Sequence, residues 1–362
     1  MTFLADLREL VELQSPSEDL EACARVVDLA VTIAGRNLAE PARVTQAGGR
    51  PVFWWGAEKP DLVLLCHLDT VWPHDSYLPL WKEEGDQIFG PGIFDMKAGF
   101  LQAMYAVKEI PGAASKVAIV GTTDEEIGSH ASRALIEELA KGAKATLIFE
   151  SSIDDTVKIG RKGTSMYRIT VQGRAAHAGL EPEKGINATT EISRIVLQMA
   201  ALENPEYGTT VVPTVMQSGS TTNTVPATAT LDIDARSFLA SELKRVDAAI
   251  RSLSAHHPEA RLEISGGINR PPLEHAATAE LYALIEEVAS SLGLPPVGHV
   301  SVGGASDGNI AAAVGGKVLD GLGASGYGAH AAHEHIFASR LEPRITLITG
   351  FINAILKKDV VE

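Results

Sequence analysis

The feature that most constrains the fold of this chain is an apolar run that ends in a histidine and an aspartate. Residues 62–66 are all apolar, and His67, Leu68 and Asp69 follow them directly. A short apolar run between polar residues is typical of a buried strand, and open α/β sheets carry their sites at the carboxyl ends of such strands. Side chains alternate along a strand, so His67 and Asp69 point to one side. The pair predicts either a solvated strand end or a metal-binding imidazole that a carboxylate orients.

The length and charge of the chain argue against several classes of protein. A chain of 362 residues is too long for one ordinary core, so we expect two domains. The apolar share of 45% and the charged share of 21% are typical of a globular protein. The net charge is −15 and no basic tract is present, which argues against a nucleic-acid partner. An anionic substrate would need a few arginines or lysines gathered in one cleft.

The cysteines and the first residues indicate a cytoplasmic protein. Cys23 falls on a predicted helix and Cys66 on a predicted buried strand, a placement that suggests no disulfide framework and fits a reducing compartment. The first ten residues carry acids within an apolar pattern and no basic region, so we expect an amphipathic helix and not a signal peptide. No segment approaches the roughly 18 uninterrupted apolar residues that cross a bilayer, so we expect no membrane association.

The order of the predicted elements changes twice along the chain. Strands and helices alternate in residues 1–163 and again in 272–362, which favours an α/β sheet with helices on both faces. Residues 164–271 follow the order strand, helix, strand, strand, helix, strand, the signature of a ferredoxin-like sandwich. We therefore expect an α/β/α catalytic domain in two parts, 1–163 and 272–362, with an α+β domain, 164–271, inserted between them.

Side chains able to bind metal follow several predicted strands. Asp95 lies in a glycine-rich turn before a helix, three acids occupy 124–126, Glu150 ends an apolar run, and His330 lies in a loop after the strand at 317–319. Each has an ordinary alternative: Asp95 as a helix N-cap, the acids as a solvated turn, and the histidine loop as plain surface. Together they predict a site for a divalent ion such as zinc, with carboxylates enough for two metals about 3.5–4 Å apart.

These segments, in this order, resemble the co-catalytic di-zinc metallopeptidase family, which includes glutamate carboxypeptidase, acetylornithine deacetylase, succinyl-diaminopimelate desuccinylase and the aminoacylases. The motifs that carry the resemblance are His67-Leu68-Asp69, Gly92-Ile93-Phe94-Asp95-Met96-Lys97-Ala98-Gly99, Asp124-Glu125-Glu126-Ile127-Gly128-Ser129, Glu150, and Ala329-His330 with Glu334. Segments 174–179, 185–188, 222–227 and 234–236 are most similar to the bacterial glutamate carboxypeptidase branch. The resemblance implies a zinc-peptidase-like catalytic domain and a lid that also forms the dimer.

The resemblance also implies a set of metal ligands. Asp95 would bridge two Zn²⁺ ions, for which Co²⁺ or Mn²⁺ could substitute. His67 and Glu150 would complete one metal site, and Glu126 and His330 the other.

Two further residues take catalytic roles by the same resemblance. Glu125 would be the general base that takes a proton from the metal-bridging water, which is the nucleophile, and passes it to the leaving nitrogen. Asp69 would orient the His67 ring. The family also tends to have a cis peptide after the bridging aspartate, here Asp95–Met96.

Four residues of the inserted domain match substrate-binding positions of the family. His177 would stabilise the oxyanion, often in the partner subunit's site, and Asn223, Arg236 and Arg270 would hold substrate, with an arginine suited to a free carboxylate. Taken alone, the position of His177 favours a buried structural histidine in a strand-to-helix turn, and Arg236 could equally be a salt-bridge partner of a neighbouring acid. Lys158 is a weaker candidate, because a lysine in such a loop is usually solvated.

The resemblance implies an enzyme: a zinc-dependent metallocarboxypeptidase or amidohydrolase that acts on peptide or linear amide bonds. It would cleave the amide bond to a C-terminal amino acid, with glutamate as the expected residue, in a small substrate with a free carboxylate. It would form a homodimer through the lid domain. An N-acyl-amino-acid or acetylornithine-type deacylase has the same metal site. A catalytically silent binding protein would lack a ligand or the base, and none is missing. His333 and His335 match no motif and are expected at the surface.

Overall fold

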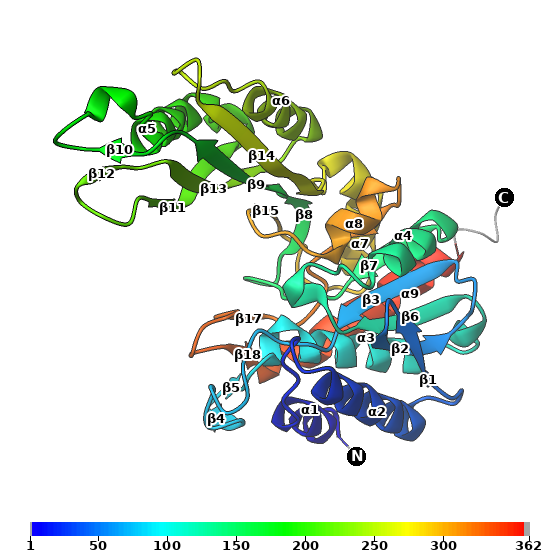
Figure 1. Cartoon of the computed structure of the whole chain (residues 1–362). Coiled ribbons are helices and arrows are strands. Elements are labelled where there is room, and N and C mark those ends of the chain that lie inside the picture. Colours follow the sequence, from blue (N-terminus) through cyan, green and yellow to red (C-terminus); the bar gives the residue numbers. More distant parts are fainter. Residues whose placement is uncertain (1, 358–362) are drawn as a thin grey trace. The chain divides into compact units, whose positions relative to one another are not determined.

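The computed structural model describes residues 2–357 (Figure 1). They form two compact units. The first contains the chain up to Gly160, Glu274–Ser301 and the residues from Ser306 onward, and the second contains Arg161–Leu273 and Val302–Ala305.

The first unit is built on a six-stranded sheet. From edge to edge its strands are β1 (Arg43–Ala47), β2 (Arg50–Gly56), β6 (Val117–Thr122), β3 (Leu62–His67), β7 (Ala145–Ile148) and β16 (Val318–Leu319). The last four run parallel, and β1 and β2 join them through antiparallel pairs. Since β3 has parallel neighbours on both sides, all six of its residues are buried, as the continuous apolar run predicted.

Helices cover both faces of this sheet (Figure 1). The main core cluster joins alternate residues of β3, Leu62, Leu64 and Cys66, to five helices: α1 (Phe3–Glu12), α2 (Leu20–Asn37), α3 (Ala98–Lys108), α7 (His275–Ser291) and α9 (Leu341–Lys357). On the other face α4 (Arg133–Gly142) packs against α8 (Asp307–Ala313), which also contacts β7 and β16. The predicted α/β/α architecture is confirmed.

A second, smaller sheet in this unit brings two distant loops together. Its strands, in spatial order, are β17 (Gly326–Tyr327), β18 (His335–Phe337), β5 (Gln87–Phe89) and β4 (Lys82–Glu84). β4 and β5 form an antiparallel hairpin through Gly85 and Asp86. Because β18 pairs with β5, the loop between β17 and β18 lies beside the turn that follows β5.

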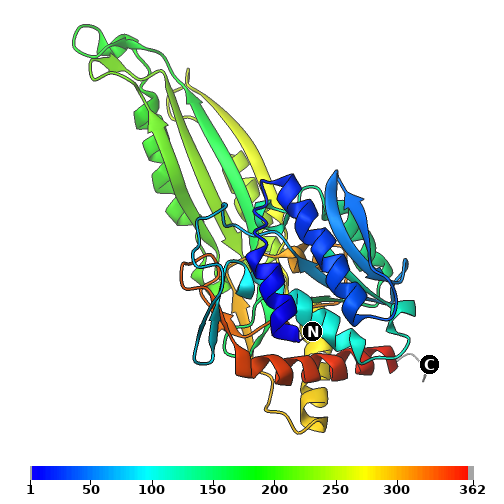
Figure 2. The ribbon, with the colours of Figure 1, turned by 90° about the horizontal axis from the view of Figure 1, so that it is seen from below.

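The second unit has the ferredoxin-like order predicted for it. Its elements are β9 (Gly163–Gln172), α5 (Ala188–Met199), β11 (Thr210–Ser218), β13 (Thr228–Ser237), α6 (Ala240–Arg251) and β14 (Arg261–Arg270), and the antiparallel sheet runs β11-β13-β9-β14. Figure 2 shows these long strands side by side. Both helices contact β9 and β13, whose alternating buried residues form a separate core with them.

Short elements complete the structure. They are β8 (Val157–Arg161) with β15 (His299–Val302), β10 (Ala176–His177) with β12 (Thr224–Val225), one π-type turn at Ile93–Lys97, and 3₁₀ turns at Ala113–Ser115, Glu125–Ile127, Pro182–Lys184, Ala200–Leu202, Pro205–Tyr207 and Ala338–Arg340. The strands β1, β8, β10, β12, β17 and β18, of two to five residues each, were not predicted from the sequence.

Candidate metal centre

The candidate metal centre lies where three neighbouring parallel strands end. His67 is the last residue of β3, Glu125 and Glu126 follow β6, and Glu150 lies two residues beyond β7. The carboxyl ends of parallel strands share one edge of a sheet, so these side chains meet although 83 positions separate the first from the last. The remaining two candidates, Asp95 and His330, come from the loops that the small sheet holds together.

The five side chains predicted as ligands lie within a few ångströms of their neighbours. His67 Nε2 is 3.3 Å from Asp95 Oδ1 and 3.8 Å from Glu150 Oε1. On the other side, His330 Nε2 is 3.4 Å from Asp95 Oδ2 and 3.1 Å from Glu126 Oε2. The Asp95 carboxylate therefore stands between the two imidazoles, with one oxygen facing each.

Asp69 contacts both His67 and the turn that carries Glu125 and Glu126. Its carboxylate is buried, accepts the Ser17 hydroxyl at 2.7 Å, and receives the backbone N–H groups of Glu125 at 3.4 Å and Glu126 at 3.2 Å. His67 Nδ1 lies 3.0 Å from the carbonyl oxygen of Asp69 and 3.5 Å from its carboxylate. Asp69 thus holds both the imidazole ring and the turn that carries the two glutamates, and the sequence pointed only to the ring.

The Asp95 turn has a backbone path that its glycine allows. Gly92 has φ of +69°, and a β-carbon there would lie 2.4 Å from Cγ2 of Thr70. The peptide bond Asp95–Met96 is cis, as the resemblance implied. Asp95 does not cap the following helix, because Lys97 occupies the N-cap position of α3. The alternative interpretation of Asp95 as an ordinary N-cap is therefore wrong.

The histidines are the counter-charges of this cluster. Ion pairs with Asp95 and Glu126 raise the pKa of His330 to about 10. Burial works against a charged His67, but its bonds to Asp69 and Asp95 outweigh burial and raise its pKa well above the usual value. Burial raises the pKa of Glu126 to about 7, with the charge of Asp95 adding to the shift. So many acids at one buried place call for cationic partners.

The residues present fit a divalent metal pair. Glu126 has a side chain only 6% exposed, and among residues 2–357 its buried Oε1 has no hydrogen-bond partner, so one acceptor is left for a ligand. Donor atoms of His67, Asp95 and Glu126 all lie within 4.8 Å of one another, and so do those of His67, Glu125 and Glu150. Imidazole and carboxylate are the donors that zinc and its neighbours accept. The second group places a carboxylate oxygen of Glu125 close to His67 and Glu150.

Three residues that sequence reasoning underrated lie around the centre. Lys158 is buried, with Nζ 3.7 Å from Glu150 Oε2, so the expectation of a solvated lysine was wrong. His335 is also buried, in β18, where its Nε2 lies 3.0 Å from Gln87 Nε2, and it is not a surface residue. Glu334 is a fully buried acid of the His330 loop. Only its spacing from His330 pointed to it, and no role followed from that.

The four predicted substrate residues lie at two ends of the second unit. His177 and Asn223 are exposed on neighbouring segments, and the backbone carbonyl oxygen of Asn223 accepts the N–H of Ala178. Arg236 and Arg270 stand at the other end, where both are opposite Thr164 of β9. The structure brings the residues together in pairs and keeps the pairs apart.

The surroundings of His177 and Arg236 bear on the structural roles that the sequence also allowed for them. His177 is not a buried structural histidine, because it is exposed and its Nδ1 accepts the N–H groups of Gly179 and Leu180. Arg236 does form a salt bridge with a neighbouring acid: its Nε and Nη2 bond to the two oxygens of Asp234 at 2.8 and 2.9 Å. Nη1 of Arg236 donates to the carbonyl oxygen of Gly303 at 3.1 Å, and the side chain as a whole is 37% exposed.

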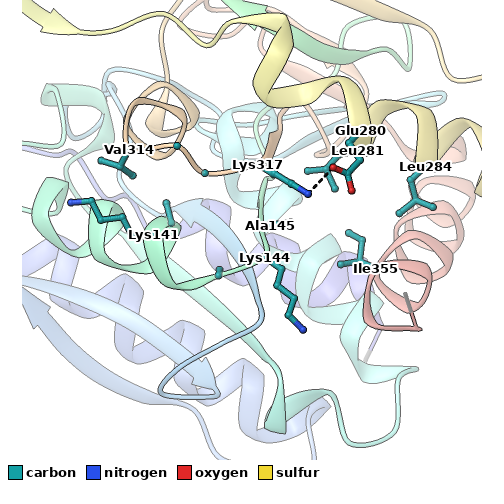
Figure 3. Close-up of a pocket in the computed structure, with 13 residues that line it drawn as sticks. Lys141, Lys144, Ala145, Glu280, Leu281, Leu284, Val314, Lys317 and Ile355 are labelled. Atoms are coloured by element: carbon teal, nitrogen blue, oxygen red, sulfur yellow. Dashed lines mark ion pairs between the residues drawn. The ribbon is translucent and has the colours of Figure 1, made fainter. Parts of the chain in front are cut away.

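A hollow of about 760 Å³ lies at the opposite end of the sheet and contains none of the predicted site residues (Figure 3). It is at the start of β7, beside Ala145. In Figure 3 the Lys141 and Lys144 side chains point in different directions, and Lys317 is held by an ion pair to Glu280 at 2.6 Å. The lysines do not converge on one point, so we assign the hollow no role.

Comparison with known proteins identifies the family. Residues 63–354 match the model of peptidase family M20/M25/M40. The chain belongs to this family. It is 29% identical over 310 residues to carboxypeptidase G2 of Pseudomonas sp., covering 81% of this chain and 73% of that protein. It is 25% identical over 313 residues to succinyl-diaminopimelate desuccinylase of Delftia acidovorans, covering 80% of each.

A solved structure supports the same fold for this family member. The aminopeptidase PepT of Bacillus cereus superposes with a TM-score of 0.76 at 21% identity and covers 98% of both chains. Together with the family match, this makes the protein a hydrolase of the metallopeptidase type. Among the described helices, none combines the length and apolar character needed to cross a membrane.

Proposed function

We propose that this enzyme is a di-zinc hydrolase that cleaves the amide bond to a C-terminal amino acid, of the glutamate carboxypeptidase type. The observation that carries the proposal is the placement of Asp95 between His67 and His330, with Glu126 and Glu150 at the flanks. Similarity to carboxypeptidase G2 supports the substrate class.

In this proposal the five side chains divide between two zinc ions. Asp95 would contact both, His67 and Glu150 would hold one, and Glu126 and His330 the other. Bound zinc supplies Lewis acidity to a carbonyl and lets water ionise near neutral pH.

The chain's own residues then handle the proton and the substrate. Glu125 takes the proton of the attacking water and delivers it to the leaving nitrogen, and its burial keeps it free of competing solvent. Asp69 holds the backbone of Glu125 and Glu126, and so keeps the base at a constant position. The buried Lys158 ammonium beside Glu150 adds a positive charge that favours a substrate carboxylate.

The inserted unit supplies the groups that recognise substrate, and two subunits are needed for them to act together. Arg236 and Arg270 would hold the free carboxylate, and His177 and Asn223 would contact the reacting carbonyl. The two pairs lie at opposite ends of β9, whose ten residues span roughly 30 Å at about 3.3 Å each. No small substrate reaches both ends, so we propose that His177 and Asn223 act in the site of a partner subunit.

The surface of the inserted unit supports a homodimer. Its edge strand β11 exposes Val212, Val215 and Met216 by 46–50%, and Leu197 of α5 is 77% exposed. Unpaired edge strands with apolar side chains are ready to pair with another chain. Both cysteines are free and buried, which fits the cytoplasm as the compartment in which the dimer works.

Removal and return of metal tests the proposal. Treatment with a chelator should abolish hydrolysis of N-acyl-glutamates, and two equivalents of Zn²⁺ per chain should restore it. Co²⁺ and Mn²⁺ are added in parallel to identify the preferred ion. Hydrolysis that survives the removal of metal would end the proposal.

A substrate panel separates the second candidate, an N-acyl-amino-acid deacylase. The similarity to a desuccinylase favours this alternative, and both activities would use the same metal centre. N-acyl-glutamates with different acyl groups are compared with N-acetylornithine and with N-succinyl amino acids. The carboxypeptidase proposal expects kcat/KM to depend on the C-terminal amino acid more than on the acyl group.

A further inference from the structure

The fully buried carboxylate of Glu334 accepts four hydrogen bonds. Its Oε1 accepts the backbone N–H groups of Phe94 at 3.0 Å and Asp95 at 3.1 Å. Its Oε2 accepts the backbone N–H of Gly92 at 3.0 Å and the indole N–H of Trp72 at 2.9 Å. All four partners are donors, so a single acid satisfies three neighbouring backbone groups of the Asp95 turn.

These bonds join three segments that each carry a predicted metal ligand. Asp95 is bonded directly through its own N–H, and His330 precedes Glu334 by four residues in the same loop. Trp72 follows His67 by five residues, beyond the end of β3. Tyr77 of that segment adds a hydroxyl that donates to the carbonyl oxygen of Glu334 at 3.0 Å, and its ring packs edge-on against Trp72.

The chemistry of the contact requires a carboxylate. An ionised acid offers two accepting oxygens, whereas the amide of glutamine offers one oxygen and an NH₂ group that only donates. A glutamine at this position would set its NH₂ against two N–H donors and leave buried groups unpaired. The bonds to a buried charge are also the stronger kind, and they offset part of the cost of burying it.

We propose that Glu334 is a positioning residue that holds Asp95 at a set place between His67 and His330 and so determines how tightly the metal pair binds. The inference rests on the proposed function, since it assumes that these residues are ligands. Glu334 does not touch the metals or the substrate in this view. It acts through the backbone of the Asp95 turn.

The test compares Glu334→Gln with the native chain in a titration of the metal-free protein with Zn²⁺, against a chromophoric chelator. Loss of supporting bonds around a metal ligand typically costs about 10–100-fold in affinity, and we expect the weaker of the two zinc constants to fall by that factor. Titration with Co²⁺ should show an altered visible spectrum, because a displaced Asp95 changes the coordination.

Asp6→Asn is the matched control for the loss of a buried acid. Asp6 lies in α1, is fully buried, and accepts Tyr105 Oη at 2.9 Å and Asn37 Nδ2 at 2.8 Å. It should lower the midpoint of urea unfolding without moving either zinc constant by more than about threefold. Equal weakening of zinc binding by both variants would mean that Glu334 acts only through stability, and the inference would be wrong.

A milder pair of variants decides the matter if Glu334→Gln does not fold. Trp72→Phe removes one of the four bonds, and Trp81→Phe removes an indole bond of 2.7 Å to Glu83 on β4, away from the turn. Zinc affinity should fall several-fold in the first and stay unchanged in the second. Unchanged affinity in Trp72→Phe, or in a folded Glu334→Gln, overturns the inference. A native chain that fails to bind two zinc ions would instead refute the proposed function.

Discussion

The candidate metal centre and the predicted substrate residues are built in opposite ways. His67, Asp95 and Glu126 gather at one edge of a sheet and are largely buried. His67 pairs with Asp95, and His330 pairs with both Asp95 and Glu126. His177 and Asn223 are exposed and stand at one end of a long strand, with the arginines at the other. The difference teaches that the candidate ligands meet within one unit, whereas the proposed substrate residues of the other unit lie in two separate places.

The largest expected effect tests whether the first region is one centre. Asp95→Ala removes the carboxylate that faces both imidazoles, so we expect zinc content to drop and hydrolysis to fall to background. Elemental analysis and an assay on N-acyl-glutamates measure the two effects. Asp61→Ala, at the other end of β3, is the control and should retain both zinc ions. An active Asp95→Ala would show that the cluster is not the centre.

The next effect separates the base from the ligands. Glu125→Gln should lower kcat by about 10²–10⁴-fold, the usual contribution of a general base, while two zinc ions stay bound. The amide keeps the size of the side chain but accepts no proton from water. Zinc content is measured beside kcat and KM. A variant that hydrolyses substrate as fast as the native enzyme would assign the base elsewhere.

Mixing two inactive variants tests whether His177 of the inserted unit acts in the site of a partner subunit. His177→Ala should reduce kcat by about 10²–10³-fold if the imidazole stabilises an oxyanion. When it is mixed with Glu125→Gln and the subunits exchange, half the dimers are mixed and carry one intact site. Activity should then return to about a quarter of the native value. No recovery after proven exchange would mean that His177 serves its own subunit.

The stability of a Gly92 variant tests how closely the Asp95 turn is packed. Gly92→Ala should lower the free energy of unfolding by about 2–5 kcal/mol, because the left-handed backbone costs about 1–2 kcal/mol and the contact of the added methyl with Thr70 at 2.4 Å costs about 1–3 kcal/mol more. Gly49→Ala is the matched control. Its φ is +85° but a β-carbon there has no neighbour within 4 Å, so we expect only the backbone cost of about 1–2 kcal/mol. Urea denaturation compares the two, and equal losses would contradict the steric part of the prediction.

The smallest effect on stability is expected for an ion pair exposed to solvent. Arg168 bonds to Asp232 at 2.6 Å on the sheet of the second unit, with side chains 62% and 28% exposed. Arg168→Ala should change the free energy of unfolding by less than about 1 kcal/mol and leave kcat/KM unchanged, since solvent screens exposed pairs. A large loss of stability would show that this face is covered, as it would be in a dimer that buries it.

The sequence predicted the fold well because its signals are local. Apolar runs such as residues 62–66, and the alternation of elements, gave the α/β/α architecture and the ferredoxin-like insertion. It failed where the decisive neighbour is remote. Lys158 reads as a solvated loop lysine and His335 as surface, and both are buried, because burial depends on segments far away in the chain.

The candidate site divides along the same line. The amino-acid types and their order were enough to name the residues that could bind metal, since imidazoles and carboxylates at strand ends are a chemical property of the chain itself. Only the tertiary structure decided that Asp95 faces both histidines, that Asp69 also holds the Glu125–Glu126 turn, and that Glu334 ties the Asp95 turn to the His330 loop. These relations arise from contacts between segments up to 242 positions apart, which strand pairing sets and which no local pattern records.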